Sequence, residues 1–196
     1  MKKKRIVVFA SGGGSNFRAI HQACLNREIP ADIVALISDS RKALALEYAR
    51  EHKIRDVVLP PRDFDDEAQY TRALMDILEE TAPDLIILAG YLKKIPHKVL
   101  EQYPRKIINI HPALLPEYGG KGWYGMRVHR AVIENRESES GCTVHYVTRD
   151  YDKGPVIAQV KVPVHSDDTP ETLAKRILKQ EHKLYPKVIR FLLTQK

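Results

Sequence analysis

The stretch RIVVFASGGGSN, residues 5–16, joins an uninterrupted apolar run to a glycine-rich loop. Further apolar runs bounded by turn residues follow it, and segments with helical spacing lie between them. Uninterrupted apolar strands that alternate with amphipathic helices are typical of a parallel sheet covered on both faces. Together with right-handed crossovers, they predict a doubly wound α/β domain. The expected strands are 5–10, 32–38, 56–60, 84–90 and 106–111, and the expected helices are 16–27, 41–52, 66–81 and 96–103.

The pattern changes after Gly120. A helix is expected at 126–135, and two alternating segments at 141–148 and 155–164 predict an antiparallel extension of the sheet. A long C-terminal helix is expected at 169–193, with Thr169 as its N-cap, Pro170 in its first turn and a kink at Pro186. Its buried stripe is predicted to be Leu173, Ile177, Leu184, Val188 and Leu192.

Length and composition favour a single globular domain that acts on small molecules. The chain has 196 residues, of which 43% are apolar and 29% charged, and it has no apolar run long enough to span a membrane. Cys24 and Cys142 form neither a disulfide framework nor a metal pattern, and the histidines lack a ligand spacing. The net charge of +7 is scattered and is not interleaved with aromatic residues, which argues against nucleic-acid binding. We therefore expect a cytoplasmic protein without a metal, in the form of a monomer or a homodimer.

The glycine-rich loop lies where nucleotide-binding α/β folds hold a phosphate, between the first strand and the first helix. It matches neither the dinucleotide fingerprint nor the Walker A loop, because no third glycine and no Gly-Lys-Ser/Thr follow at the required spacing. A phosphate monoester bound by Gly14, Ser15 and Asn16 is the functional interpretation. The structural alternative is a tight turn in which Ser15 or Asn16 is the N-cap.

The segment IINIHP, residues 107–112, ends an apolar strand with an amide and an imidazole. Residues two apart in a strand face the same side, so Asn109 and His111 point together at the carboxyl end of the fifth strand, where ligands of such sheets bind. An amide donor beside a titratable imidazole suits a developing oxyanion. Asp152, in a turn-rich loop, is the best candidate to orient the imidazole. The alternative is a strand end capped by Asn109, with His111 as an ordinary semi-buried histidine.

No convincing nucleophile accompanies this pair, so direct transfer between two bound substrates is favoured over a covalent intermediate. Three segments, SGGGSN (11–16), NIHPALLPEY (109–118) and HYVTRDYDKGPVIAQVKVPV (145–164), closely resemble the folate-dependent formyltransferases, in particular those that formylate glycinamide ribonucleotide. The resemblance covers essentially the whole chain. It implies a Rossmann-like formyltransferase domain over residues 1–196, with a phosphate-binding half (1–111) and a folate-binding and C-terminal half (112–196).

The resemblance also implies the substrates and the roles of the site residues. The amine of glycinamide ribonucleotide would attack the formyl carbon of 10-formyltetrahydrofolate, with Asn109 holding the formyl oxygen and His111 charged by pairing with Asp152. His145 is either a supporting residue or an ordinary strand histidine. According to the resemblance, Glu181 would join Gly14, Ser15 and Asn16 in binding the ribonucleotide. Without the resemblance, the sequence favours placing Glu181 on a solvated helix face. The folate would contact Leu92, Lys93, Lys94, Ile95, Asn109, Thr148, Arg149, Asp150, Tyr151 and Asp152.

Two departures from the family pattern leave questions open. Glu67 stands where some relatives have an arginine near the folate tail, and Arg62 is the nearby basic residue that could substitute for it. The segment 119–131 is longer than the Tyr-Pro-Gly link of other members and contains the single tryptophan, Trp123. It is interpreted as a lid over the substrates, an interface or a surface insertion.

Other functions compete with this one. Within the superfamily they are hydrolysis of formyltetrahydrofolate, formylation of initiator tRNA and formylation of a nucleotide-sugar amine. We expect the first two to need an additional domain before the first strand or after the last helix, for which Met1 and Lys196 leave no room. The loop GGGSN favours a ribonucleotide monophosphate over a nucleotide sugar. Outside the superfamily, a non-catalytic nucleotide-binding module would bind ligand without transferring a formyl group.

Overall fold

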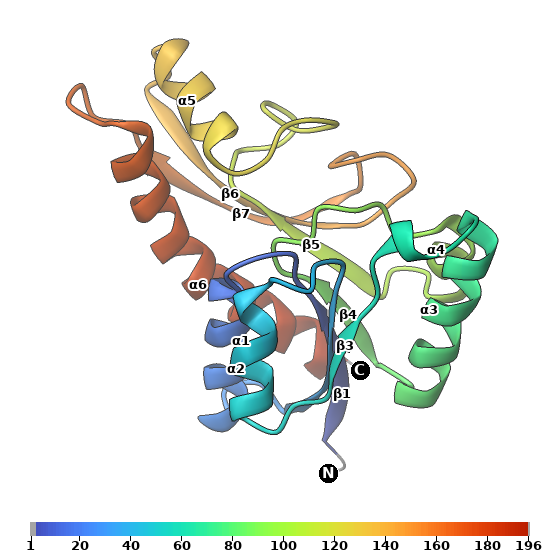
Figure 1. Ribbon diagram of the computed structural model, residues 1–196. Helices are drawn as coiled ribbons and strands as arrows, with labels where there is room; N and C mark the ends of the chain where they lie inside the picture. Colours follow the sequence, from blue (N-terminus) through green and yellow to red (C-terminus); the bar gives the residue numbers. More distant parts are fainter. Residues whose placement is uncertain (1–2, 196) are drawn as a thin grey trace.

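The computed structural model describes residues 3–195, which form one seven-stranded sheet in the order β3-β2-β1-β4-β5-β6-β7 (Figure 1). The first five strands run parallel, and β6 and β7 are antiparallel to their neighbours. The predicted doubly wound sheet with an antiparallel extension is confirmed. The strands are β1 (Lys4–Phe9), β2 (Ala31–Ser38), β3 (Asp56–Val58), β4 (Leu85–Leu88), β5 (Ile107–His111), β6 (Glu139–Tyr146) and β7 (Val156–Pro163).

Helices cover both faces of the sheet. In Figure 1, α1, α2 and α6 lie on one side of the parallel strands, and α3 and α4 lie on the other. All the expected helices are present, with ends within a few residues of the predicted ones. They are α1 (Ser15–Leu25), α2 (Leu44–Glu51), α3 (Glu67–Thr81), α4 (His97–Gln102), α5 (Met126–Glu134) and α6 (Pro170–Thr194), and a short 3-10 turn spans Pro61–Asp63.

The central strand β1 is buried on both faces, which explains its uninterrupted apolar sequence. Ile6 and Val8 belong to the core shared with α1, α2 and α6, whereas Val7 and Phe9 belong to the core shared with α3 and α4. All four side chains are fully buried. Alternation along a strand sends successive side chains to opposite faces, so one short run anchors both layers.

The start of α1 differs from the structural alternative considered above. The N-cap is Gly14, not Ser15 or Asn16, and it adopts a left-handed conformation with φ of 72°. A Cβ at this position would lie 2.7 Å from the Cβ of Ala45, so glycine is required both by conformation and by space. Ser15 and Asn16 therefore lie inside the first turn, with their backbone N–H groups at the open end of the helix.

The long helix α6 packs against α1, α5, β6 and β7. The Thr169 side chain accepts a hydrogen bond from the Thr172 N–H, and the Thr172 hydroxyl binds back to the Thr169 N–H, which confirms the predicted cap. The helix continues through Pro186 as one element; the kink there stays a prediction. Its predicted stripe is buried except for Leu192, which is partly buried. Among residues 3–195, no helix is both long and apolar enough to cross a membrane.

Candidate active site

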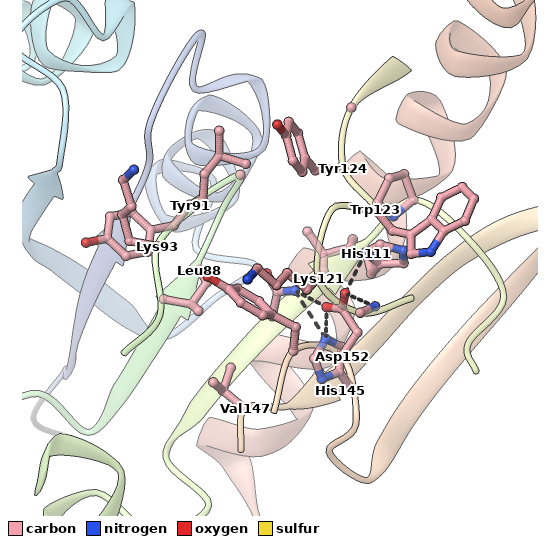
Figure 2. A pocket seen from close by; sticks show the side chains of 18 of the residues that line it. Leu88, Tyr91, Lys93, His111, Lys121, Trp123, Tyr124, His145, Val147 and Asp152 are labelled. Atoms are coloured by element: carbon pink, nitrogen blue, oxygen red, sulfur yellow. Dashed lines mark hydrogen bonds and ion pairs between the residues drawn. The ribbon is translucent and has the colours of Figure 1, made fainter. Parts of the chain in front are cut away.

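The strand order reverses between β1 and β4, so the loops that leave these strands diverge and open a crevice. Two hydrogen bonds tie the loops together: the Ser11 N–H donates to the Gly90 carbonyl oxygen at 3.1 Å, and the Leu92 N–H donates to the Ser11 hydroxyl at 3.0 Å. A cavity of about 660 Å³ occupies this crevice (Figure 2). Every predicted site residue except Gly14 lines it, including residues from both ends of the chain.

Asn109 and His111 face the same side of β5, as strand alternation requires, and Asp152 lies opposite both. The Asn109 Nδ2 is 3.5 Å from Asp152 Oδ1, and the His111 Nδ1 is 3.6 Å from Asp152 Oδ2. Asp152 comes from the loop that joins β6 to β7, 41 positions beyond His111 in the sequence. The antiparallel extension therefore brings the carboxylate to the end of the parallel strand.

His145 is part of this group. It pairs with Asn109 across β5 and β6, and its Nε2 lies 3.1 Å from Asn109 Nδ2 and 3.4 Å from Asp152 Oδ1 (Figure 2). Its Nδ1 lies 2.9 Å from the Tyr146 carbonyl oxygen, which can only accept. We therefore assign the proton of a neutral His145 to Nδ1, so that Nε2 accepts from the Asn109 amide. Of the two earlier interpretations, the supporting residue agrees with this geometry.

Burial of His111 works against the charge that the resemblance implies for it, and that charge stays a prediction. Burial lowers its pKa, and this outweighs the attraction of Asp152 and the hydrogen bond to the Tyr118 carbonyl oxygen, which both raise it; neighbouring His145 lowers it further. The Nε2–H donates to that carbonyl at 2.7 Å. A neutral His111 thus carries its proton on Nε2, and Nδ1 is the nitrogen that can take up another proton, facing Asp152.

Asp152 is the ionised member of the group. Burial raises its pKa, but the neighbouring imidazoles of His145 and His111 and the Gly120 N–H together bring the pKa below its usual value. The Gly120 N–H donates to Asp152 Oδ2 at 2.9 Å. The Asp152 backbone has φ of 55°, a left-handed conformation that is uncommon outside glycine and directs the carboxylate toward β5. Strained conformations of this kind concentrate at functional sites.

The start of α1 and the middle of α6 form one half of the cavity. The Asn16 Nδ2 donates to Glu181 Oε2 at 2.6 Å, and both side chains are buried. Burial raises the pKa of Glu181, and the bond from Asn16 partly opposes this. The Asn16 Oδ1 is buried and has no hydrogen-bond partner among residues 3–195. The sequence without the resemblance favoured a solvated helix face for Glu181, and its burial shows that this interpretation is wrong.

The loops 92–95 and 148–152 form the other half. The Lys94 ammonium lies 5.2 Å from the centre of the Tyr151 ring, which links the two loops. Ile95 is buried, whereas Leu92 remains 48% exposed on the rim, an apolar surface available to a flat ligand. A second cleft continues from this half, and Glu67 is among its lining residues, with Lys93, Lys94 and Arg149; Arg62 is not.

Sequence reasoning left the role of the segment 119–131 open between a lid, an interface and a surface insertion, and it did not single out His129. The long segment after Gly119 lines the cavity through Lys121, Trp123 and Tyr124, and the ring of Trp123 packs edge-on against Tyr118. The segment therefore contributes to the rim of the pocket. His129 in α5 also lines the cavity; it lies within the segment 119–131, and only this position could have singled it out.

This fold and this site define a doubly wound α/β protein in which the open start of a helix and an Asn–His–Asp group line the same cavity. The chain belongs to the formyl transferase family, whose model matches residues 4–189. The assigned class and the resemblance found in the sequence therefore agree.

The relatives are consistent with this assignment. The chain is 44% identical over 189 residues to "Phosphoribosylglycinamide formyltransferase, chloroplastic" of Arabidopsis thaliana, covering 96% of this chain but only 65% of that protein. It is 39% identical to phosphoribosylglycinamide formyltransferase of Escherichia coli over 94% of this chain and 84% of that protein. Glycinamide ribonucleotide transformylase 1 of Symbiobacterium toebii superposes with a TM-score of 0.90 at 38% identity, covering 97% and 88%. A formyltetrahydrofolate deformylase of Pseudomonas putida shares the fold. It superposes with a TM-score of 0.84 at 24% identity over 98% of this chain and 66% of that chain.

Proposed function

We propose that this protein transfers the formyl group of 10-formyltetrahydrofolate to the amine of glycinamide ribonucleotide, a step of purine biosynthesis. The observation that carries the proposal is the meeting, in one cavity, of a helix start suited to phosphate and the Asn109–His111–Asp152 group. The products are formylglycinamide ribonucleotide and tetrahydrofolate. The relatives described above, which bear the name of this activity, support the same assignment.

The ribonucleotide fits the half formed by α1 and α6. Its phosphate is placed at the N–H groups that follow Gly14, where the helix dipole favours an anion. Its ribose then lies near Asn16 and Glu181, whose side chains are hydrogen-bonded to each other. The folate fits the half formed by the loops 92–95 and 148–152. Six basic residues around the cavity suit two substrates that carry phosphate and carboxylate groups: Lys93, Lys94, Lys121, Arg127, Arg149 and Lys175.

The transfer forms one C–N bond and breaks another. The amine of the ribonucleotide attacks the formyl carbon, the bond from that carbon to the folate nitrogen breaks, and one proton moves from the amine to the folate nitrogen. The weaker of the two hydrogen bonds made by the Asn109 amide, the 3.5 Å contact with Asp152, is the one that a developing oxyanion can replace at little cost. His111 can take up the moving proton at Nδ1, and the negative charge of Asp152 stabilises the imidazolium while it lasts.

A direct assay tests this proposal. The protein is mixed with glycinamide ribonucleotide and 10-formyltetrahydrofolate, and the appearance of the deformylated folate is followed by absorbance. We expect turnover that requires both substrates and that falls by about 10²-fold or more in Asn109→Ala and in His111→Ala while the circular dichroism spectrum is retained. Loss of the formyl group without the ribonucleotide would indicate the hydrolase instead. Tight ribonucleotide binding without any turnover would indicate a non-catalytic binding module.

We also propose that the reaction takes place in the cytoplasm. Cys24 and Cys142 are both free thiols, which is usual in a reducing compartment. Fractionation of cells that express the full-length protein tests this location.

A further inference from the structure

His129 is a buried polar residue that the reaction described above does not use. It lies in α5, is 5% exposed and lines the cavity. Its Nδ1 is fully buried and has no hydrogen-bond partner among residues 3–195. Burying a polar atom without a partner destabilises the folded state, so such an atom in a native protein needs an explanation. Violations of this kind are expected where a side chain serves a ligand rather than the fold.

The neighbouring polar groups already have partners. Asn109 donates to His145 and Asp152, the His111 Nε2–H donates to the Tyr118 carbonyl oxygen, and Asp152 accepts from the Gly120 N–H. By contrast, the side chain of His129 makes no hydrogen bond to the other described residues. The imidazole of His129 therefore has hydrogen-bonding capacity that the described residues do not use.

The protonation state of His129 follows from its surroundings. Burial, with a further contribution from His111, lowers the pKa of His129 to about 4, so the imidazole is neutral near neutral pH. A neutral imidazole carries one N–H and one lone pair. A buried N–H without an acceptor is the rarer arrangement, so we assign the lone pair to Nδ1 and the proton to Nε2. Nε2–H is then the polar group that the cavity can reach, a neutral donor.

The position of α5 indicates which substrate this donor meets. The helix packs against α6, which supplies Glu181, Leu178 and Ala174 to the ribonucleotide half of the cavity. His111 also lies close enough to His129 to contribute to the lowered pKa of His129. In glycinamide ribonucleotide, the amide carbonyl is two bonds from the attacking amine, on the side of the ribose. A donor beside His111 on the α6 side therefore faces this carbonyl when the amine is at the reaction centre.

We propose that His129 is a further substrate-binding residue, which donates a hydrogen bond from Nε2 to the glycinamide carbonyl oxygen of the ribonucleotide and so positions the amine for attack. This inference rests on the proposed function. It gives α5 a role in substrate specificity for an α-amino amide over other amines. An amine that lacks the carbonyl would leave the Nε2–H of His129 without an acceptor.

The experiment combines a change in the protein with the matching change in the substrate. His129→Leu is expected to lower kcat/KM for glycinamide ribonucleotide about 10- to 100-fold, with an unchanged KM for the folate. His129→Gln, whose amide donor can reach the position of Nε2, is expected to restore much of this loss. With an analogue in which a methylene replaces the glycinamide carbonyl, the wild-type protein and His129→Leu should be equally slow.

Stability separates this role from a structural one. Because Nδ1 has no partner, His129→Leu should leave the melting temperature unchanged or raise it. His182→Leu is the matched control: its Nε2 is also buried without a partner in the described part of the chain, but His182 does not line the cavity, so kinetics should stay unchanged. The inference is overturned if His129→Leu retains wild-type kcat/KM, or if the loss is the same with the analogue. Absence of turnover in the wild-type protein would instead refute the proposed function, and ribonucleotide binding by calorimetry would then test His129 alone.

Discussion

Acidification should destabilise this protein through His129, and the effect can be calculated from the structure. The pKa of His129 is about 4 in the folded protein, against an ordinary value of 6.5, because of burial. As the pH falls below 6.5, His129 becomes protonated in the unfolded chain but stays neutral in the folded protein. The contribution of His129 to the unfolding free energy is therefore fully present above pH 6.5 and is lost as the pH falls toward 4. At 1.36 kcal/mol for each pH unit, the full difference amounts to about 3 kcal/mol. Between pH 7 and pH 5 the loss is about 2 kcal/mol.

Urea unfolding at several pH values measures this loss. Far-UV circular dichroism is the suitable probe, because the single tryptophan, Trp123, lies in the exposed rim segment and does not report on the core. Other groups add to the pH dependence with the same sign, since burial also lowers the pKa of His21, His111 and His182. The comparison of wild type with His129→Leu removes these shared contributions.

The expected result is that the unfolding free energy of His129→Leu falls by about 2 kcal/mol less than that of wild type between pH 7 and pH 5. Equal losses in the two proteins would show that His129 titrates normally in the folded state. The burial argument, and with it the assignment of a neutral donor to the cavity, would then be wrong.

Three more substitutions test other parts of the site. Asp152→Asn removes the charge that supports the imidazolium, so kcat should fall about 10²-fold or more while substrate KM values change little; an unchanged kcat would contradict this role. Glu181→Ala leaves its amide partner unpaired and should raise KM for the ribonucleotide about 10-fold without altering KM for the folate in the same kinetic assay. Gly14→Ala should lower the unfolding free energy by about 1–3 kcal/mol in urea titrations, because φ is 72° and a Cβ would lie 2.7 Å from Ala45 Cβ, whereas Gly13→Ala, with no atom within 4 Å, should be nearly neutral.

The layered fold could be predicted because it is encoded in local periodicity. The run from Ile6 to Phe9 is apolar throughout, since β1 is covered on both faces, and amphipathic segments mark the helices that cover it. The same strand alternation placed Asn109 and His111 on one side of β5. Positions 119–125 follow no such period, and only the folded arrangement of the loops brings them to the rim of the cavity.

The protonation states and the free hydrogen-bonding groups could not be predicted in this way. Burial lowers the pKa of His111 more than its carboxylate neighbour raises it, and the Tyr118 carbonyl oxygen accepts the hydrogen bond from Nε2–H. The Asn109 amide is hydrogen-bonded to His145 on the neighbouring strand. The buried Nδ1 of His129 has no hydrogen-bond partner among residues 3–195.

The sequence by itself therefore determined the layers, the order of the elements and the types of chemical group that reach the crevice, because these depend on side-chain periodicity and on short motifs. Only the tertiary structure decided which of these groups are charged, which are already paired and which remain for a substrate. Desolvation and hydrogen-bond partners arise from segments that are distant in the chain, and they change a pKa or occupy a donor in ways that local sequence does not record.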